Sequence, residues 1–147
     1  MTTGQVSMKV VGDLLRSLED CLEDLQKLPT ESLEEFAVDF RNPAAAESLL
    51  RRAIQALFDL LRHLLARRYG KGALEYKELA QLAVEKGFIQ DARLAAVLKE
   101  LGGFRNRLTH VYQDVTSEEL YGILKNELGD LEAIADELRQ AAIRTLA

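Results

Sequence analysis

Apolar residues recur every three or four positions along most of this chain, which is the spacing of an α-helix with one buried face. Four long segments show this spacing, at about residues 6–28, 43–69, 91–112 and 117–146. Two shorter helices are expected at about residues 30–38 and 76–86. The pattern predicts an all-α chain, a helical bundle of about four long helices with one or two short ones.

Residues that favour helix ends stand between these segments. Asn42 followed by Pro43 is a typical helix start, an N-cap and then a proline in the first turn, and Gly70 is suited to the end of the same helix. Thr116 with Glu119 three residues later predicts a capping box at the start of the last helix. We expect that last helix to run unbroken to about residue 146.

A pair of glycines, Gly102 and Gly103, lies inside the third long segment. Each glycine within a helix costs about 1 kcal/mol relative to alanine, so the pair needs a structural reason. Three reasons are open: a kink, a close approach of another helix, or a break between two helices.

The composition is that of a single folded domain spanning residues 1–147. Hydrophobic residues make up 48% of the 147 and charged residues 29%, a balance that argues against disorder. No run of 18 uncharged apolar residues and no signal-peptide layout is present, so we expect a cytoplasmic protein without a membrane association. The only cysteine, Cys21, falls on the apolar face of the first helix and is expected to be inert packing.

Charge is distributed unevenly along the chain, whose net charge is −5. Residues 1–40 carry 3 basic and 9 acidic side chains, residues 41–110 carry 13 and 7, and residues 111–147 carry 3 and 8. A basic middle between acidic ends is compatible with a local anion-binding surface, and incompatible with broad non-specific nucleic-acid binding.

The basic middle ends in the stretch from Phe104 to Tyr112, which contains one of the two histidines. On a helix continued to Tyr112, Asn106 and His110 point away from the apolar stripe, while Tyr112 lies at its edge, roughly 20° from Arg105. A histidine moves protons near neutral pH, and an arginine offers a planar charge that matches phosphate. These parts suit metal-free RNA cleavage, in which a ribose 2′-hydroxyl attacks the neighbouring phosphorus.

The spacing Arg105-x4-His110-x-Tyr112 resembles the R-x4-H-x-Y signature of HEPN-domain ribonucleases. The surrounding residues, from about Pro43 to Leu131, look like the HepT branch of these toxins, which are encoded beside a minimal nucleotidyltransferase antitoxin. The resemblance implies a dimeric HEPN-type bundle that acts as a metal-independent endoribonuclease toxin of a type VII toxin–antitoxin pair. Its implied partners are an RNA substrate, a second copy of the chain and the cognate nucleotidyltransferase.

The resemblance also implies roles for individual residues. Arg105 holds the scissile phosphate, and His110 is the general acid or base or orients the 2′-hydroxyl. From its place on the same face, Asn106 is a further catalytic candidate that can hydrogen-bond to the substrate or to His110. Tyr112 is the acceptor of adenylyl groups that the antitoxin transfers. Arg105 and His110 would lie roughly 140° apart on one helix, so a two-fold dimer is expected to bring both into one cleft. Arg107 and Thr109 are further candidates for substrate binding.

One alternative function remains open at this point. The chain could be a non-catalytic HEPN binding module that serves as the partner subunit of a nucleotidyltransferase. The second histidine, His63, is interpreted as a packing or interface residue, because its neighbours form neither a metal set nor a catalytic triad. The sequence shows no zinc, nucleotide-loop or Ser/Cys nucleophile pattern, so no metal and no cofactor is expected.

Overall fold

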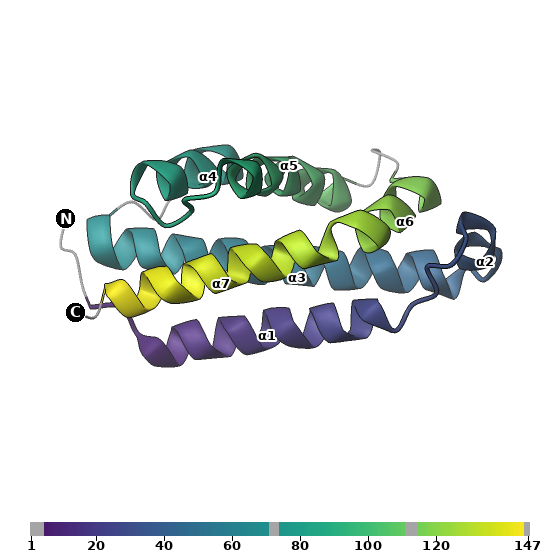
Figure 1. Cartoon of the computed structure of the whole chain (residues 1–147), viewed down its shortest axis with the longest axis horizontal. Coiled ribbons are helices and arrows are strands. Elements are labelled where there is room, and N and C mark those ends of the chain that lie inside the picture. Colours follow the sequence, from purple (N-terminus) through teal and green to yellow (C-terminus); the bar gives the residue numbers. More distant parts are fainter. Residues whose placement is uncertain (1–4, 71–73, 111–114, 146–147) are drawn as a thin grey trace.

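A computed structural model describes residues 5–70, 74–110 and 115–145. These residues form seven α-helices and no strand, as the pattern predicts (Figure 1). The four long helices are α1 (Met8–Gln26), α3 (Arg41–Tyr69), α5 (Ala92–Thr109) and α7 (Leu128–Arg144). The three short ones are α2 (Leu33–Val38), α4 (Tyr76–Glu85) and α6 (Ser117–Asn126).

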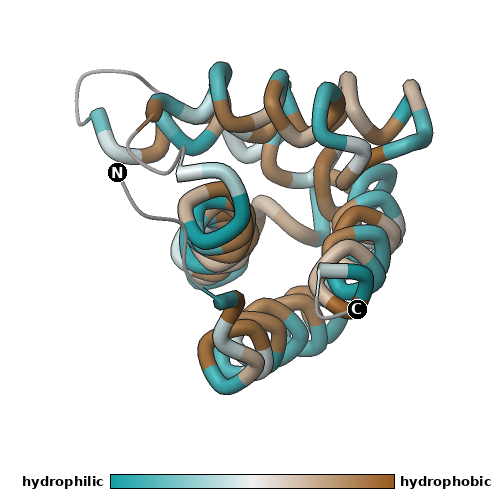
Figure 2. Tube along the Cα trace, turned by 90° about the vertical axis from the view of Figure 1, so that its left-hand side faces the viewer, coloured by the Kyte–Doolittle hydropathy of each residue, from teal (hydrophilic) through white to brown (hydrophobic). Residues whose placement is uncertain are grey.

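The central element is α3, which packs against each of the other six helices. Viewed down the bundle, the helices turn their hydrophobic residues inward, toward one shared core (Figure 2). Between Ala53 and Leu65, α3 is buried except at four polar residues, Gln55, Asp59, Arg62 and His63. The first three are spaced four and three residues apart and form a polar stripe along one side of the helix.

Local capping explains where several helices begin. The side chains of Ser7, Asp91 and Thr116 each accept a hydrogen bond from a backbone N–H in the first turn of the helix that follows. The Glu119 side chain also accepts a hydrogen bond from the backbone N–H of Thr116, which confirms the predicted capping box. Gly70 ends α3 with a φ of 70°, a left-handed conformation that favours glycine.

Helix α3 begins at Arg41, before the start predicted at Pro43. Asn42 does not cap it, because the Asn42 side chain donates to the carbonyl of Phe36 at 3.1 Å instead. Asp39 binds the Arg41 backbone N–H at 3.0 Å, so the helix starts earlier. Pro43 still lies in the first turn, where a missing N–H removes no intrahelical bond.

The last predicted helix is wrong as a single element, because Glu127 separates α6 from α7. Its φ of −121° and ψ of −4° lie outside helical values. The two segments pack on different neighbours: α6 contacts α2, whereas α7 contacts α1 and α5. The bend lets one stretch of chain cover both ends of the bundle (Figure 1).

Gly102 explains the glycine pair. Helix α5 continues through both glycines without a break. A Cβ built on Gly102 would lie 2.9 Å from the Cβ of Tyr76 and 3.3 Å from Cζ of Phe58, whereas one on Gly103 would meet nothing within 4 Å. The close approach of another helix, one of the three predicted reasons, is therefore correct for Gly102.

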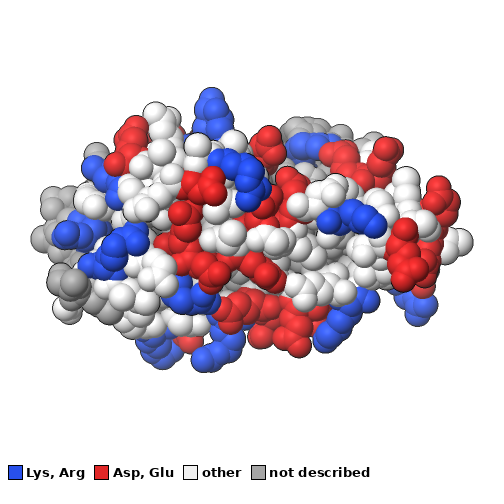
Figure 3. Space-filling view, viewed as in Figure 1, with Lys and Arg blue, Asp and Glu red and all other residues white. Residues whose placement is uncertain are grey.

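The acidic ends of the sequence meet on one face of the molecule. Acidic side chains form a band across the middle of this face, over α1 and α7, with lysines and arginines at its margins (Figure 3). Cys21 is buried in the core, as expected, and burial raises the pKa of its thiol. Among the described residues, no helix combines the length and apolar character needed to cross a membrane.

Candidate active site

Arg105 lies on α5 with its side chain half-buried against the polar stripe of α3. Its Nη2 donates a hydrogen bond of 2.6 Å to Oε1 of Gln55. Gln55 is itself held, because its Nε2 donates to Asp59 at 2.8 Å and its Oε1 also accepts from the Tyr76 hydroxyl at 3.1 Å. Three helices, α3, α4 and α5, thus fix the guanidinium of Arg105.

The acceptor that holds Arg105 is a neutral amide. Several other arginines of the described chain pair with carboxylates instead, as Arg93 does with Asp130 at 2.7 Å. The Nε of Arg105 is buried and has no hydrogen-bond partner among the described residues. No carboxylate bond to Arg105 is therefore found in the described chain, and its Nε donor is unused.

The helix that carries Arg105 ends at Thr109, so the prediction of a helix continuing to Tyr112 is wrong. The Thr109 hydroxyl donates to the Asn106 carbonyl at 2.8 Å, which competes with helix continuation. His110 takes an extended conformation, with φ −99° and ψ 108°. The angle of roughly 140° expected between Arg105 and His110 on a common helix does not apply.

The remaining motif residues fall in different surroundings. Asn106, Thr109 and His110 are exposed. Tyr112 lies outside the described residues. Arg107, a candidate for substrate binding, forms a bidentate pair with Glu119 at 2.5 and 3.0 Å.

This Arg107–Glu119 pair joins the end of α5 to the first turn of α6. The hydrogen bond from Arg107 lowers the pKa of the Glu119 carboxyl, and the bond to Glu119 raises the pKa of Arg107. Both oxygens of Glu119 are occupied by Arg107, and one of them also accepts from Thr116. The contact is thus part of the scaffold that holds the motif.

His63 has a structural contact of its own. Its Nε2 accepts the backbone N–H of Ser7 at 3.0 Å and so anchors the start of α1 to α3. Burial, and next the nearby charge of Arg67, lower the pKa of His63. This placement agrees with the interpretation as a packing residue.

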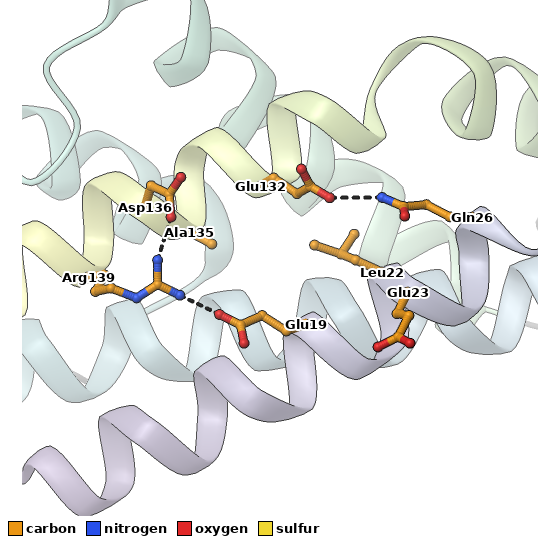
Figure 4. A pocket seen from close by; sticks show the side chains of 8 residues that line it. All are labelled: Glu19, Leu22, Glu23, Gln26, Glu132, Ala135, Asp136 and Arg139. Atoms are coloured by element: carbon orange, nitrogen blue, oxygen red, sulfur yellow. Dashed lines mark hydrogen bonds and ion pairs between the residues drawn. The ribbon is translucent and has the colours of Figure 1, made fainter.

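A hollow between α1 and α7 differs in character from the surroundings of Arg105 (Figure 4). Its walls carry Glu19, Glu23, Glu132 and Asp136, and a single arginine, Arg139, bridges Glu19 and Asp136. Such a negatively charged surface repels phosphate. Within the described ranges, no group of three or more His, Cys, Asp or Glu side chains is placed to hold a metal ion.

The sequence analysis missed Gln55, which fixes the guanidinium of Arg105. A signal was present, because Gln55 and Asp59 interrupt an otherwise apolar helix at a spacing of four residues. Buried polar groups need partners, so such a stripe predicts a hydrogen-bond network. Its partner on α5 could not be identified from spacing, since Gln55 and Arg105 are 50 residues apart.

The bundle carries Arg105 on α5 and the exposed His110 directly after the last residue of that helix. The family model described as ribonuclease HepT-like matches residues 18–138, and the chain belongs to this family. That membership confirms the family resemblance and the prediction of a ribonuclease. A relative named tRNA nuclease HepT, from Aphanizomenon flos-aquae, is 29% identical over 101 residues, covering 68% of this chain and 67% of that protein.

Solved structures share the fold. A tri-AMPylated HEPN toxin from Shewanella oneidensis, in complex with its MNT antitoxin, matches with a TM-score of 0.79 at 19% identity, over 89% of this chain and 97% of that one. A tyrosine-to-alanine variant of an MntA–HpeT toxin–antitoxin complex matches with a TM-score of 0.75 at 19% identity, over 89% of this chain and 98% of that one. The all-α HEPN fold is thereby confirmed.

Proposed function

We propose that this chain is the toxin of a type VII toxin–antitoxin pair and cleaves RNA without a metal ion through Arg105 and His110. The observation that carries the proposal is the anchoring of Arg105 by a neutral amide, at 2.6 Å, with its buried Nε unused. An arginine paired with a carboxylate would already be neutralised. Arg105 instead presents a fixed, uncompensated guanidinium, which suits the charge that develops on a phosphate in the transition state.

In this mechanism the ribose 2′-oxygen attacks the adjacent phosphorus. The O2′–P bond forms while the P–O5′ bond breaks, which leaves a 2′,3′-cyclic phosphate and a free 5′-hydroxyl. His110, exposed beyond the end of α5, removes the proton of the 2′-hydroxyl or supplies one to O5′. Asn106, also exposed and in the last turn of α5, hydrogen-bonds to the substrate.

The relatives support a substrate and a partner. Because one relative is named a tRNA nuclease, we propose tRNA as the substrate class. Because the Shewanella oneidensis toxin is AMPylated and bound to an MNT antitoxin, we propose that a minimal nucleotidyltransferase neutralises this chain by adenylylating Tyr112. The added phosphates would compete with RNA for Arg105.

We further propose that the active form is a homodimer with both motifs at one cleft, as the family resemblance implies. Mixing Arg105→Ala chains with His110→Ala chains tests this arrangement. If each cleft takes Arg105 from one subunit and His110 from the other, mixed dimers regain part of the activity that both parents lack. A monomer by light scattering at micromolar concentration refutes the dimer.

Cleavage of tRNA by purified variants tests the catalytic assignment. Arg105→Ala and His110→Ala are each expected to abolish cleavage, with helicity unchanged because neither side chain belongs to the core. Activity of the wild type should persist in excess EDTA. Full activity in either variant contradicts the assignment, and a wild type that binds the antitoxin but never cuts RNA identifies a non-catalytic binding module.

A further inference from the structure

A pocket of about 290 Å³ adjoins Arg105 on the side of α3 and α1. Arg51 and Arg52 of α3 line it together with Arg105, and Leu14 and Ser17 of α1 form the opposite wall. Three arginines from two helices therefore line one hollow. Residues 51 and 52 belong to the basic middle of the sequence, which was expected to supply a local anion-binding surface.

The charge of this pocket is not neutralised from within. Arg51 and Arg52 make no hydrogen bond or ion pair with another residue of the described chain, whereas Arg41, Arg93 and Arg139 are all paired with carboxylates. Asp59 is the only acidic residue lining the pocket, and it already binds Arg62 at 3.4 Å and Gln55 at 2.8 Å. Three cations thus face one carboxylate that is engaged elsewhere.

Two features point to phosphate as the ligand. Guanidinium groups bind phosphate oxygens through paired hydrogen bonds, and Arg51 and Arg52 have these donors available. Arg105 also lines the pocket, and its Nε has no hydrogen-bond partner in the described chain. An RNA segment with one phosphate at Arg105 and the neighbouring phosphate at Arg51 and Arg52 would supply anions to all three arginines.

We propose that this pocket is a subsite for a second phosphate of the RNA backbone, adjacent to the scissile phosphate held at Arg105. The inference rests on the proposed ribonuclease function, because it takes Arg105 as the contact to the scissile group. The subsite fixes the register of the RNA relative to His110. Arg51 and Arg52 therefore act on substrate binding, while Arg105 acts on the chemical step.

Binding of bulk tRNA tests the subsite, with every chain carrying His110→Ala so that no RNA is cut. Arg51→Gln with Arg52→Gln should weaken binding about tenfold at low salt. The slope of log K against log salt concentration should fall by roughly 0.7–0.9, the value for one phosphate contact. Arg51→Lys with Arg52→Lys keeps the charge, so its slope should match that of the parent.

The matched control is Arg67→Gln with Arg68→Gln, which removes two charges from the same helix. These residues are exposed and lie about 24 Å further along α3, so binding should stay unchanged. Equal weakening by both pairs would mean that only overall charge matters, and it would overturn the subsite. Unchanged tRNA affinity of the Arg51/Arg52 variant overturns the subsite too. If that variant loses only antitoxin binding, the pocket is a protein-docking surface and the subsite is likewise overturned.

Kinetics separate this inference from the proposed function. With His110 intact, Arg51→Gln with Arg52→Gln should raise KM about tenfold and leave kcat nearly unchanged, whereas Arg105→Ala should remove kcat. A wild type that shows no cleavage, yet binds tRNA in a manner that depends on Arg51 and Arg52, would refute the ribonuclease mechanism and keep the phosphate site. Full cleavage with unchanged KM in the Arg51/Arg52 variant would refute the phosphate site and leave the ribonuclease mechanism standing.

Discussion

Adding one methyl group at each of the two adjacent glycines of α5 should change stability in opposite directions. At Gly103 a Cβ meets nothing within 4 Å, so Gly103→Ala should stabilise the protein by about 1 kcal/mol through helix propensity alone. Gly102→Ala gains the same propensity but brings its Cβ within 2.9 Å of the Cβ of Tyr76. That atom is attached directly to the backbone of α4, so relief requires a shift of the helix.

Overpacking of this kind costs about 1–3 kcal/mol, which is therefore the expected difference between the two variants. The comparison is matched, because the positions are neighbours in one helix and the propensity gain cancels. Urea unfolding followed by far-ultraviolet circular dichroism measures the difference in unfolding free energy between the two variants. For a chain of this size, each kcal/mol of that difference corresponds to roughly 2–4 °C in Tm. A Gly102→Ala protein as stable as Gly103→Ala would refute the close approach of α5 and α4.

Three further outcomes are expected. Gln55→Leu removes the acceptor that fixes Arg105, and a hydrogen bond to a charged group contributes about 1.5–3 kcal/mol. The kcat for tRNA cleavage should therefore fall at least tenfold, with helicity preserved. An unchanged kcat would show that Gln55 does not position Arg105. The folded-state pKa of His63 is lowered, so the unfolded chain binds more protons than the folded one as pH falls below about 6.5, and stability should decrease there. His63→Gln should flatten this pH dependence of stability in urea melts. An equally steep dependence in that variant would exclude His63 as its source. Incubation with the cognate nucleotidyltransferase and ATP should add AMP masses to the wild type and none to Tyr112→Phe; persistent addition would move the acceptor to Tyr121 or Tyr76.

The helices were predictable because their signals are local. The apolar spacing, the capping box at Thr116 and the glycine at position 70 act within a few residues of the element they define. The bend at Glu127 was not predictable in this way, because it depends on which helices α6 and α7 pack against. The end of α5 at Thr109 was missed for a different reason, since a side-chain hydrogen bond to Asn106 competes with the backbone pattern.

The candidate site was predictable only in part. The motif spacing identified Arg105 and His110, whose catalytic roles remain predictions. The contacts that orient Arg105 come from residues 50 and 29 positions away, Gln55 directly and Tyr76 through it, and no periodicity encodes such pairings. Arg107 was a candidate for substrate binding because of its charge alone; its bond to Glu119 depends on how α6 returns to α5.

The Arg107–Glu119 pair also closes a ring of chain. Its two ends are 12 residues apart in sequence, and both His110 and Tyr112 lie between them. Lengthening a closed loop costs little, because the entropy of closure grows only with the logarithm of its length. Changes in the length of the segment between residues 110 and 115 should therefore cost the bundle little folding free energy. The reactive segment can thus change in length without a change in the contacts that hold the bundle together.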